Sequence, residues 1–237
     1  RRTGEYMKDL IKTVEEYKAK EEICAIGKRI LASGMVAAND GNISVRLSKH
    51  EILCTPTGVS KGYMKPEMIC KVDEKGNLLE AEGGYRPSSE VKMHLRVYEK
   101  RPDVTAVVHT HAPFATTFAI MGTPIDEPIT TEAVVSLGEV PLAPFALPGT
   151  MEVPDSIEPF LQDYDAVLLR NHGVLTYSET LEEAYLKMEE VEFFARLVYQ
   201  TKMLGGAKPF KEDVIQKLYD IRRNSGMKGR HPALSKK

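Results

Sequence analysis

The segment "AVVHTHAPFATTFA", residues 106–119, places two histidines at the end of an apolar, β-branched run. The run predicts a buried strand, and Pro113 predicts that the strand ends just after His111. In a strand, side chains two residues apart point to the same face, with Cα atoms about 7 Å apart. His109 and His111 are therefore placed to share one metal ion, or each can hydrogen-bond a neighbour. The spacing alone leaves both interpretations open.

A third histidine ends another apolar run. His172 lies in "LLRNHGV", residues 168–174, and Gly173 after it lets the backbone turn tightly beside a ligand. Catalytic zinc sites commonly take three protein ligands and leave one coordination position open. His109, His111 and His172 are thus a candidate ligand set, against the alternative of three partly buried, hydrogen-bonded histidines. The other histidines are expected to be structural or solvated: His50 in a turn, His94 on a helix and His231 in the tail.

The segment "RPSSEVKMH", residues 86–94, begins a predicted helix after Pro87. The free N–H groups and the positive dipole end of a helix favour an anion. Ser88 and Ser89 either cap this helix or bind a phosphate. Glu90 falls in the first turn, where a carboxylate is favourable even without a catalytic role.

Two turns of small residues are further candidates for a ligand contact. In "TPTGVSKG", residues 55–62, Thr57 and Gly58 can form a backbone nest for a phosphate or an ordinary turn. In "NDGNIS", residues 39–44, Asn42 can reach a ligand. The chain has neither a Walker-type loop nor a strand followed by GxGxxG, so the sequence does not support nucleotide binding.

The composition is that of an ordinary globular protein of 237 residues, with 42% hydrophobic and 28% charged residues. Its net charge of −2 gives no electrostatic reason to expect a nucleic-acid or membrane partner. The apolar runs are too short to span a bilayer, and we expect no leader segment. Three separated cysteines without a C-x-x-C pair indicate reduced thiols and a cytoplasmic protein.

Periodicity predicts several strands arranged in hairpins and flanked by helices, hence a mainly antiparallel sheet covered by helices. Without a linker or repeat, we expect one domain over residues 1–237, with a flexible basic tail over 226–237. The expected helices are 15–34, one after Pro87, 114–122, 181–204 and 211–224. The expected strands are 41–47, 51–58, a pair within 68–84, 104–113, 128–131, 139–145 and a pair within 166–177.

Four segments together resemble the class II aldolase/adducin family. They are "AANDGNISVRL" (37–47), "TPTGVSKGYM" (55–64), "PSSEVKMHLRVYEKRPDVTAVVHTHAPFA" (87–115) and "LLRNHGVLTYSETLEEAYLKMEEVE" (168–192). The resemblance runs from about residue 16 to 204, and more loosely to 225. It implies an α/β fold of the α+β type: three αβα layers with a central, mainly antiparallel sheet. It also implies a homotetramer with fourfold symmetry and active sites near the subunit interfaces.

The resemblance also assigns residues to a site. It implies that His109, His111 and His172 hold Zn²⁺ or another divalent metal. Glu90 would be the catalytic acid/base and would also contact the metal when no substrate is bound. The substrate phosphate would be bound by Asn42, Thr57, Gly58, Ser88 and Ser89.

Glu90 favours one branch of the family, because the epimerase branch has Asp at this position. The implied reaction is reversible cleavage of a ketose 1-phosphate, such as L-fuculose 1-phosphate, into dihydroxyacetone phosphate and a small aldehyde, such as L-lactaldehyde. The alternatives are cleavage of 5-deoxyribulose or methylthioribulose 1-phosphate, a sugar-phosphate 4-epimerase and a decarboxylase of a sugar-acid phosphate. An adducin-like interaction module without zinc is disfavoured, because the three histidines and the glutamate are all kept.

The sequence departs from the family at the aldehyde half of the site. Fuculose-phosphate aldolases use two tyrosines there, and Thr130 and Ser225 align with them. Glu132 and Tyr219 are candidates to replace these tyrosines.

Overall fold

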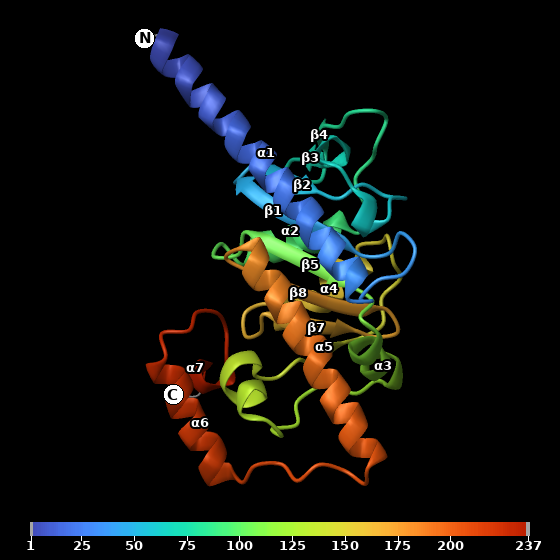
Figure 1. The fold of residues 1–237 in the computed structure, drawn as a ribbon, viewed down its shortest axis with the longest axis vertical. Coiled ribbons are helices and arrows are strands. Elements are labelled where there is room, and N and C mark those ends of the chain that lie inside the picture. Colours follow the sequence, from blue (N-terminus) through green and yellow to red (C-terminus); the bar gives the residue numbers. More distant parts are fainter. Residues whose placement is uncertain (1, 236–237) are drawn as a thin grey trace.

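The computed structural model describes residues 2–235, in which eight strands form one sheet in the order β4-β3-β2-β1-β5-β8-β7-β6 (Figure 1). The neighbouring strands are antiparallel, except that β6 and β7 are parallel. The strands are β1 (Asn42–Ser48), β2 (Glu51–Cys54), β3 (Cys70–Val72), β4 (Leu78–Glu80), β5 (Ala106–Thr110), β6 (Leu142–Ala143), β7 (Ala166–Leu169) and β8 (Gly173–Ser178).

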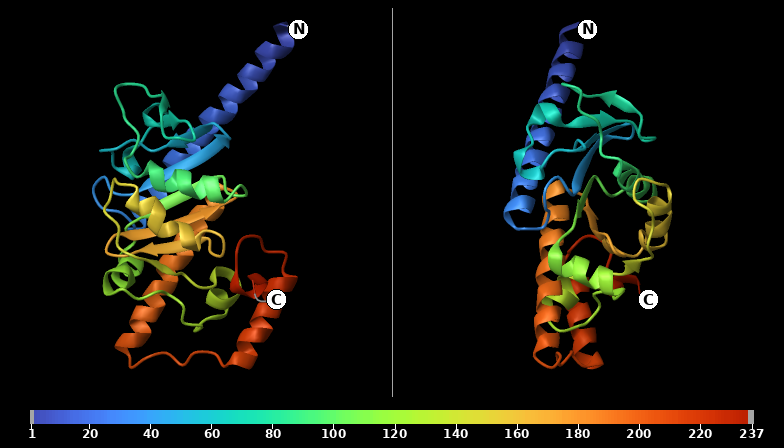
Figure 2. Two further views of the ribbon diagram at one scale, coloured as in Figure 1. Left: turned by 180° about the vertical axis from the view of Figure 1, so that it is seen from behind. Right: turned by 90° about the vertical axis from the view of Figure 1, so that its right-hand side faces the viewer.

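Helices cover both faces of this sheet, so the expected three-layer α/β fold is confirmed. Figure 2 shows α1 and α5 on one face and α2 and α4 on the other. The helices are α1 (Arg2–Ala32), α2 (Val91–Lys100), α3 (Pro113–Met121), α4 (Glu152–Ile157), α5 (Leu181–Met203), α6 (Glu212–Asn224) and α7 (Pro232–Ser235). Short 3₁₀ or π turns lie at Lys61–Tyr63, Pro66–Met68, Ala133–Leu137 and Glu158–Phe160.

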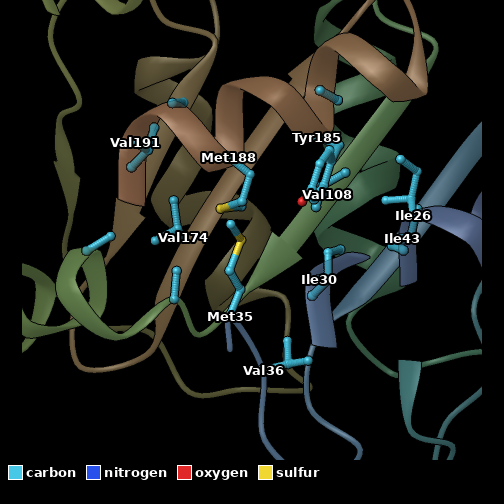
Figure 3. Packing of buried hydrophobic residues seen from close by; sticks show 14 of the residues in the cluster. Ile26, Ile30, Met35, Val36, Ile43, Val108, Val174, Tyr185, Met188 and Val191 are labelled. Atoms are coloured by element: carbon cyan, nitrogen blue, oxygen red, sulfur yellow. The ribbon is translucent and has the colours of Figure 1, made fainter. Parts of the chain in front are cut away.

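Strand β5 is buried on both faces and separates two apolar cores. On one face, Val108 packs with residues of α1 and α5 such as Ile30 and Met188 (Figure 3). On the other face, Val107 belongs to the cluster formed with α2. Because side chains alternate along a strand, His109 lies on the same face as Val107, toward α2.

Helix α5 begins and packs as its sequence predicts. The Thr180 hydroxyl accepts a hydrogen bond from the Glu183 N–H at 3.2 Å and caps the first turn. The expected buried face is fully buried: Ala184, Met188, Val191, Ala195 and Val198. Within residues 2–235, no helix combines the length and the apolar character needed to cross a membrane.

Three local expectations were wrong. The helix expected over 15–34 begins at Arg2. The expected strand at 128–131 is absent, and the Thr130 hydroxyl instead accepts a hydrogen bond from the N–H of Ala133, the first residue of the π turn. The helix after Pro87 begins only at Val91, with Glu90 immediately before it, so neither serine is its cap.

The described part of the C-terminal tail is packed against the domain, whereas the sequence suggested a flexible segment. His231 and Ala233 are buried, and the His231 Nε2 lies 2.7 Å from the Val134 carbonyl oxygen. The Arg230 N–H donates to Asp165 at 2.7 Å. Residues 236–237 lie outside the described residues.

One carboxylate of α5 fixes the chain just after the two histidines of β5. Buried Glu192 accepts hydrogen bonds from the N–H groups of Phe114 (3.0 Å) and Ala115 (2.9 Å). These are first-turn amides of α3, which have no partner within their own helix. Glu192 therefore stabilises the point at which the chain leaves the sheet after His111.

We expect Glu192→Met, which keeps the side-chain length but removes both acceptor oxygens, to lower the free energy of unfolding by about 2 kcal/mol. Urea unfolding measures this change. The matched control is Glu182→Met on the same helix, since Glu182 pairs with Arg29 at the surface and should cost under about 1 kcal/mol. Equal losses in the two variants would contradict this role of Glu192.

Candidate metal centre and phosphate cavity

Three imidazoles meet at one end of the sheet. His109 lies near the end of β5, His111 follows the strand, and His172 lies in the turn between β7 and β8. The antiparallel register, with Thr110 opposite Val174, carries that turn to the end of β5. The ring centroids are 4.8 Å apart for His109 and His172, and 5.1 Å for each of the other two pairs.

Neighbouring acceptors fix the tautomers of two of these rings. The His109 Nδ1 lies 2.8 Å from the Val174 carbonyl oxygen, and the His111 Nδ1 lies 3.3 Å from an Asp40 carboxylate oxygen. Each contact places the ring proton on Nδ1 and leaves the Nε2 lone pair free, as is usual for metal-binding histidines. Both Nε2 atoms are buried and have no hydrogen-bond partner in the described structure.

A carboxylate lies against the same rings. Glu90 Oε1 is 3.0 Å from the His172 Nε2, and Oε2 is 3.5 Å from the His109 Nε2. Asn42 donates to Oε2 at 2.7 Å, and Oε1 is buried beside the His172 ring. Burial acts to raise the pKa of Glu90, but the interaction with His172 and the hydrogen bond from the Asn42 amide lower it. Burial lowers the pKa of His109, so this imidazole is neutral.

Close packing leaves no room for a side chain on the residue after His172. A Cβ atom on Gly173 would lie 2.4 Å from the Thr110 carbonyl oxygen and 2.9 Å from the ring of His111. The sequence suggested a glycine for a tight turn, and the structure gives close packing as the reason at this position.

These residues fit a divalent metal ion. The candidate ligand atoms of His109, His111 and His172 all lie within 4.8 Å of one another. Neutral imidazoles with free lone pairs and a carboxylate form a donor set that suits Zn²⁺ and similar ions. The side chains of His109, His172 and His111 are 0%, 14% and 28% exposed, so the cluster opens toward solvent on the side of His111.

A cavity of about 250 Å³ lies beside the cluster. Its lining includes Glu90 and His111, and it brings together all five candidate phosphate contacts: Asn42, Thr57, Gly58, Ser88 and Ser89. Gly58 has a φ of +75°, which side-chain-bearing residues rarely adopt.

Three residues that matter here were not assigned to the site from the sequence. The Asp40 carboxylate orients the ring of His111 through its contact with Nδ1. Lys61 lines the cavity, is almost fully buried, and donates to the carbonyl oxygens of Asn39 and Val59. Burial lowers the pKa of Lys61 to about 8. His94 lies behind Asn42 and is hydrogen-bonded to it. A buried lysine or histidine has no signature of its own in one sequence, since its burial depends on the fold.

The candidates for the aldehyde half of the site lie elsewhere in the chain. Thr130, Glu132, Tyr219 and Ser225 are not among the described residues that line this cavity. The Thr130 hydroxyl accepts a hydrogen bond from the Ala133 N–H, and Ser225 follows the end of α6.

Comparison with known proteins identifies the relatives of this chain. Residues 21–199 match the model of the class II aldolase and adducin N-terminal domain. The chain is 36% identical over 203 residues to the 5-deoxy-D-ribulose 1-phosphate aldolase of Bacillus thuringiensis, covering 85% of this chain and 93% of that protein. It is 32% identical over 170 residues to an L-fuculose phosphate aldolase of Methanococcus maripaludis, covering 72% and 90% respectively.

Two further matches extend this picture. A 3-oxo-tetronate 4-phosphate decarboxylase of Escherichia coli is 33% identical over 188 residues, covering 78% of this chain and 87% of that protein. A solved structure of L-fuculose 1-phosphate aldolase superposes with a TM-score of 0.78 at 29% identity, covering 86% of this chain and 95% of that one. The fold is thus shared by relatives whose names describe different reactions.

We expect the purified chain to bind about one zinc ion per protomer, and His111→Ala to weaken that binding by at least about 100-fold, because one of three ligands is lost. Elemental analysis after dialysis against a competing chelator measures the retained metal. His50→Ala is the control, since His50 is exposed and pairs with Glu74 far along the sheet. A variant at position 111 that keeps a full equivalent of metal would contradict the ligand assignment.

Proposed function

Because the chain belongs to the class II aldolase and adducin family, we propose that it is a metal-dependent aldolase that reversibly cleaves a ketose 1-phosphate. The products are dihydroxyacetone phosphate and a small aldehyde. The observation that carries the proposal is the position of Glu90, between the imidazole cluster and a cavity lined by hydroxyl and backbone donors.

The three histidines hold the metal, for which Zn²⁺ is the proposed identity. A divalent cation supplies a Lewis acid that stabilises the negative charge left on the three-carbon fragment when the C3–C4 bond breaks. Because the three imidazoles are neutral ligands, they leave the charge of the cation undiminished for that purpose.

Glu90 is the proposed catalytic acid/base. Its carboxyl group lies at the edge of the histidine cluster, so a dihydroxyacetone phosphate half bound to the metal would place the carbon that takes up or loses a proton beside it. Its position just before α2 couples it to Ser88 and Ser89, so the phosphate contacts and the acid/base belong to one short segment.

Asn42, Thr57, Gly58, Ser88 and Ser89 are the proposed phosphate contacts. Their hydroxyl, amide and backbone groups line one cavity, and a phosphate held there would fix the reacting carbons relative to Glu90. Orientation of this kind lowers a barrier by several kcal/mol, roughly 7–11 at most. Buried Lys61 adds positive charge to the wall of the cavity.

Two features favour an aldolase over the other reactions of the family. Residue 90 is Glu, as in the aldolase branch. A relative whose name states aldolase activity matches 85% of this chain. Decarboxylation of a sugar-acid phosphate is the second candidate, because one relative carries that name. The physiological ketose 1-phosphate is proposed to be L-fuculose 1-phosphate or a 5-deoxyribulose 1-phosphate.

A cytoplasmic homotetramer with active sites near subunit interfaces is the proposed assembly. Large apolar side chains are exposed from the middle of α5 to just past its C-terminal end, including Phe193 at 61% and Leu204 at 88%. An interface there would bury them. A neighbouring subunit would then supply the contacts to the aldehyde that Thr130, Glu132, Tyr219 and Ser225 do not make within their own protomer. The cysteines Cys24, Cys54 and Cys70 are free and buried, which fits a reducing compartment.

We expect zinc-loaded protein to release dihydroxyacetone phosphate from at least one ketose 1-phosphate, and a chelator to stop the release. A coupled assay with glycerol-phosphate dehydrogenase measures the product for L-fuculose, 5-deoxyribulose and methylthioribulose 1-phosphates. Relative kcat/KM values then identify the aldehyde. Release of CO₂ from a 3-oxo sugar-acid phosphate without dihydroxyacetone phosphate formation would favour the decarboxylase instead.

We expect Glu90→Gln to retain zinc and lose at least about 100-fold in kcat, because the amide keeps the shape of the side chain but cannot take up a proton. Metal content and steady-state kinetics are measured on the same preparation. Glu82→Gln, a substitution in the loop before α2, serves as the control. Full turnover in the variant at position 90 would exclude Glu90 from proton transfer.

A further inference from the structure

Behind Glu90, four buried polar side chains continue into the protein as a single hydrogen-bonded line. Asn42 Nδ2 lies 2.7 Å from Glu90 Oε2, and Asn42 Oδ1 lies 2.5 Å from His94 Nε2. The other ring nitrogen of His94 is 2.6 Å from the Ser44 hydroxyl, which is 2.7 Å from the Tyr98 hydroxyl. These four side chains are between 0% and 5% exposed.

The secondary structure explains why these side chains meet. Asn42 and Ser44 are two residues apart on β1 and point to the face covered by α2. His94 and Tyr98 are four residues apart on α2 and therefore lie on one side of that helix. Their side chains meet between β1 and α2, and the line ends at Glu90, just before α2.

The orientation of the Asn42 amide fixes the direction of every bond in the line. Its NH₂ group donates to Glu90 Oε2, so its carbonyl oxygen, which can only accept, faces His94 Nε2. His94 must then donate through Nε2–H, which leaves Nδ1 as an acceptor for the Ser44 hydroxyl. The Ser44 oxygen in turn accepts from Tyr98.

His94 carries no charge in this arrangement. Burial lowers the pKa of its imidazole to about 4, although the nearby Glu90 carboxylate opposes the shift. Burial also raises the pKa of the Tyr98 hydroxyl, which keeps its proton. The line therefore consists of neutral donors that all point toward the Glu90 carboxyl group at its end. Aligned hydrogen bonds of this kind strengthen one another.

We propose that His94, as the neutral Nε2–H tautomer, is a positioning residue for the acid/base: it fixes the amide of Asn42 so that Asn42 donates to Glu90. The inference rests on the proposed function in that Glu90 is taken as the acid/base. Without the His94 proton, the Asn42 amide is free to rotate by 180° and place its oxygen against the carboxylate. Glu90 would then lose its hydrogen bond and its fixed position beside His109 and His172.

Two substitutions separate this role from simple packing. His94→Phe fills the ring space and removes the donor, whereas His94→Gln retains an N–H donor at nearly the same reach. We expect His94→Phe to lose about 10–100-fold in kcat, as for other residues that orient a reacting group from behind. We expect His94→Gln to recover most of that loss, although both variants lose stability.

The matched control is Thr176→Val. Thr176 is fully buried and donates to the Ala184 carbonyl oxygen on the opposite face of the sheet. This variant loses one buried hydrogen bond without touching the line, so its stability should fall while its kcat stays at the wild-type value. All kinetics are measured with full zinc occupancy and at a temperature well below each unfolding transition.

A second measurement does not depend on activity. In zinc-loaded wild-type protein with ¹⁵N-labelled histidine, the ¹⁵N chemical shifts of His94 should report a protonated Nε2 and an unprotonated Nδ1. The side-chain amide protons of Asn42 should exchange slowly with water in wild-type protein and in His94→Gln, and rapidly in His94→Phe.

The outcomes distinguish a failure of the positioning role of His94 from a failure of the proposed function. An Nδ1–H tautomer, slow Asn42 exchange in His94→Phe, or equal kcat losses in the Phe and Gln variants would overturn the positioning role. If wild-type protein releases no dihydroxyacetone phosphate from any substrate, the proposed function fails. The tautomer and the amide exchange then still decide whether His94 orients Asn42 toward Glu90.

Discussion

The site depends on the pairing of β5 with its two neighbours. On one side Asn42 of β1 is opposite His109, and on the other Leu175 of β8 is opposite His109. The first pairing brings the Asn42 amide, and through it Glu90, to the imidazole. The second carries the turn that holds His172. A slip of one residue in either pairing would move these side chains to the other face of the sheet, so backbone hydrogen bonding sets the geometry of the metal centre.

The two faces of β5 have different tasks. The face toward α1 and α5 is apolar, and there Val108 packs against residues such as Met188 (Figure 3). The face toward α2 changes from apolar at Val107 to polar at His109 within one strand repeat. The apolar face and Val107 supply burial that stabilises the sheet, which allows the polar end of the strand to carry desolvated donors and acceptors. Stability and chemistry are thus divided partly between the two faces and partly along the face toward α2, where Val107 packs in the core and His109 lies at the site.

Much of this arrangement could be predicted from the sequence, because it follows from local patterns. The strand that contains His109, the turn at His172 and the capped helix after Thr180 each have a signal within a few residues. The expected strand at 128–131 failed because Thr130 caps a turn instead, a choice that short apolar runs do not reveal. The burial of His231 depends on contacts with residues about 100 positions away, so the sequence of the tail alone indicated only a polar segment.

The long-range part of the site could not be predicted in the same way. His94 has the sequence context of an ordinary helical histidine, and its tautomer follows only from the partners that the fold places around it. The same holds for Asp40, which is 71 residues from His111 in the sequence but orients its ring. Residue types at a strand end can predict which atoms bind a ligand. They do not predict which neighbours fix the protons on those atoms, because these neighbours come from other elements.

The buried carboxylate of Glu90 contacts both the histidine cluster and the hydrogen-bonded line through His94. Burying a charge is unfavourable unless other groups compensate it. Within residues 2–235, the Glu90 carboxylate accepts a hydrogen bond from Asn42, and its nearest imidazole nitrogen is the His172 Nε2 at 3.0 Å. The Nε2 lone pairs of His109 and His111 are free because their Nδ1 atoms face acceptors, so these nitrogens and the carboxylate form a donor set that a divalent cation would complete. The hydrogen-bonded line through His94 keeps the Asn42 amide in place. Asn42 thereby fixes Oε2 of Glu90, while Oε1 lies beside His172.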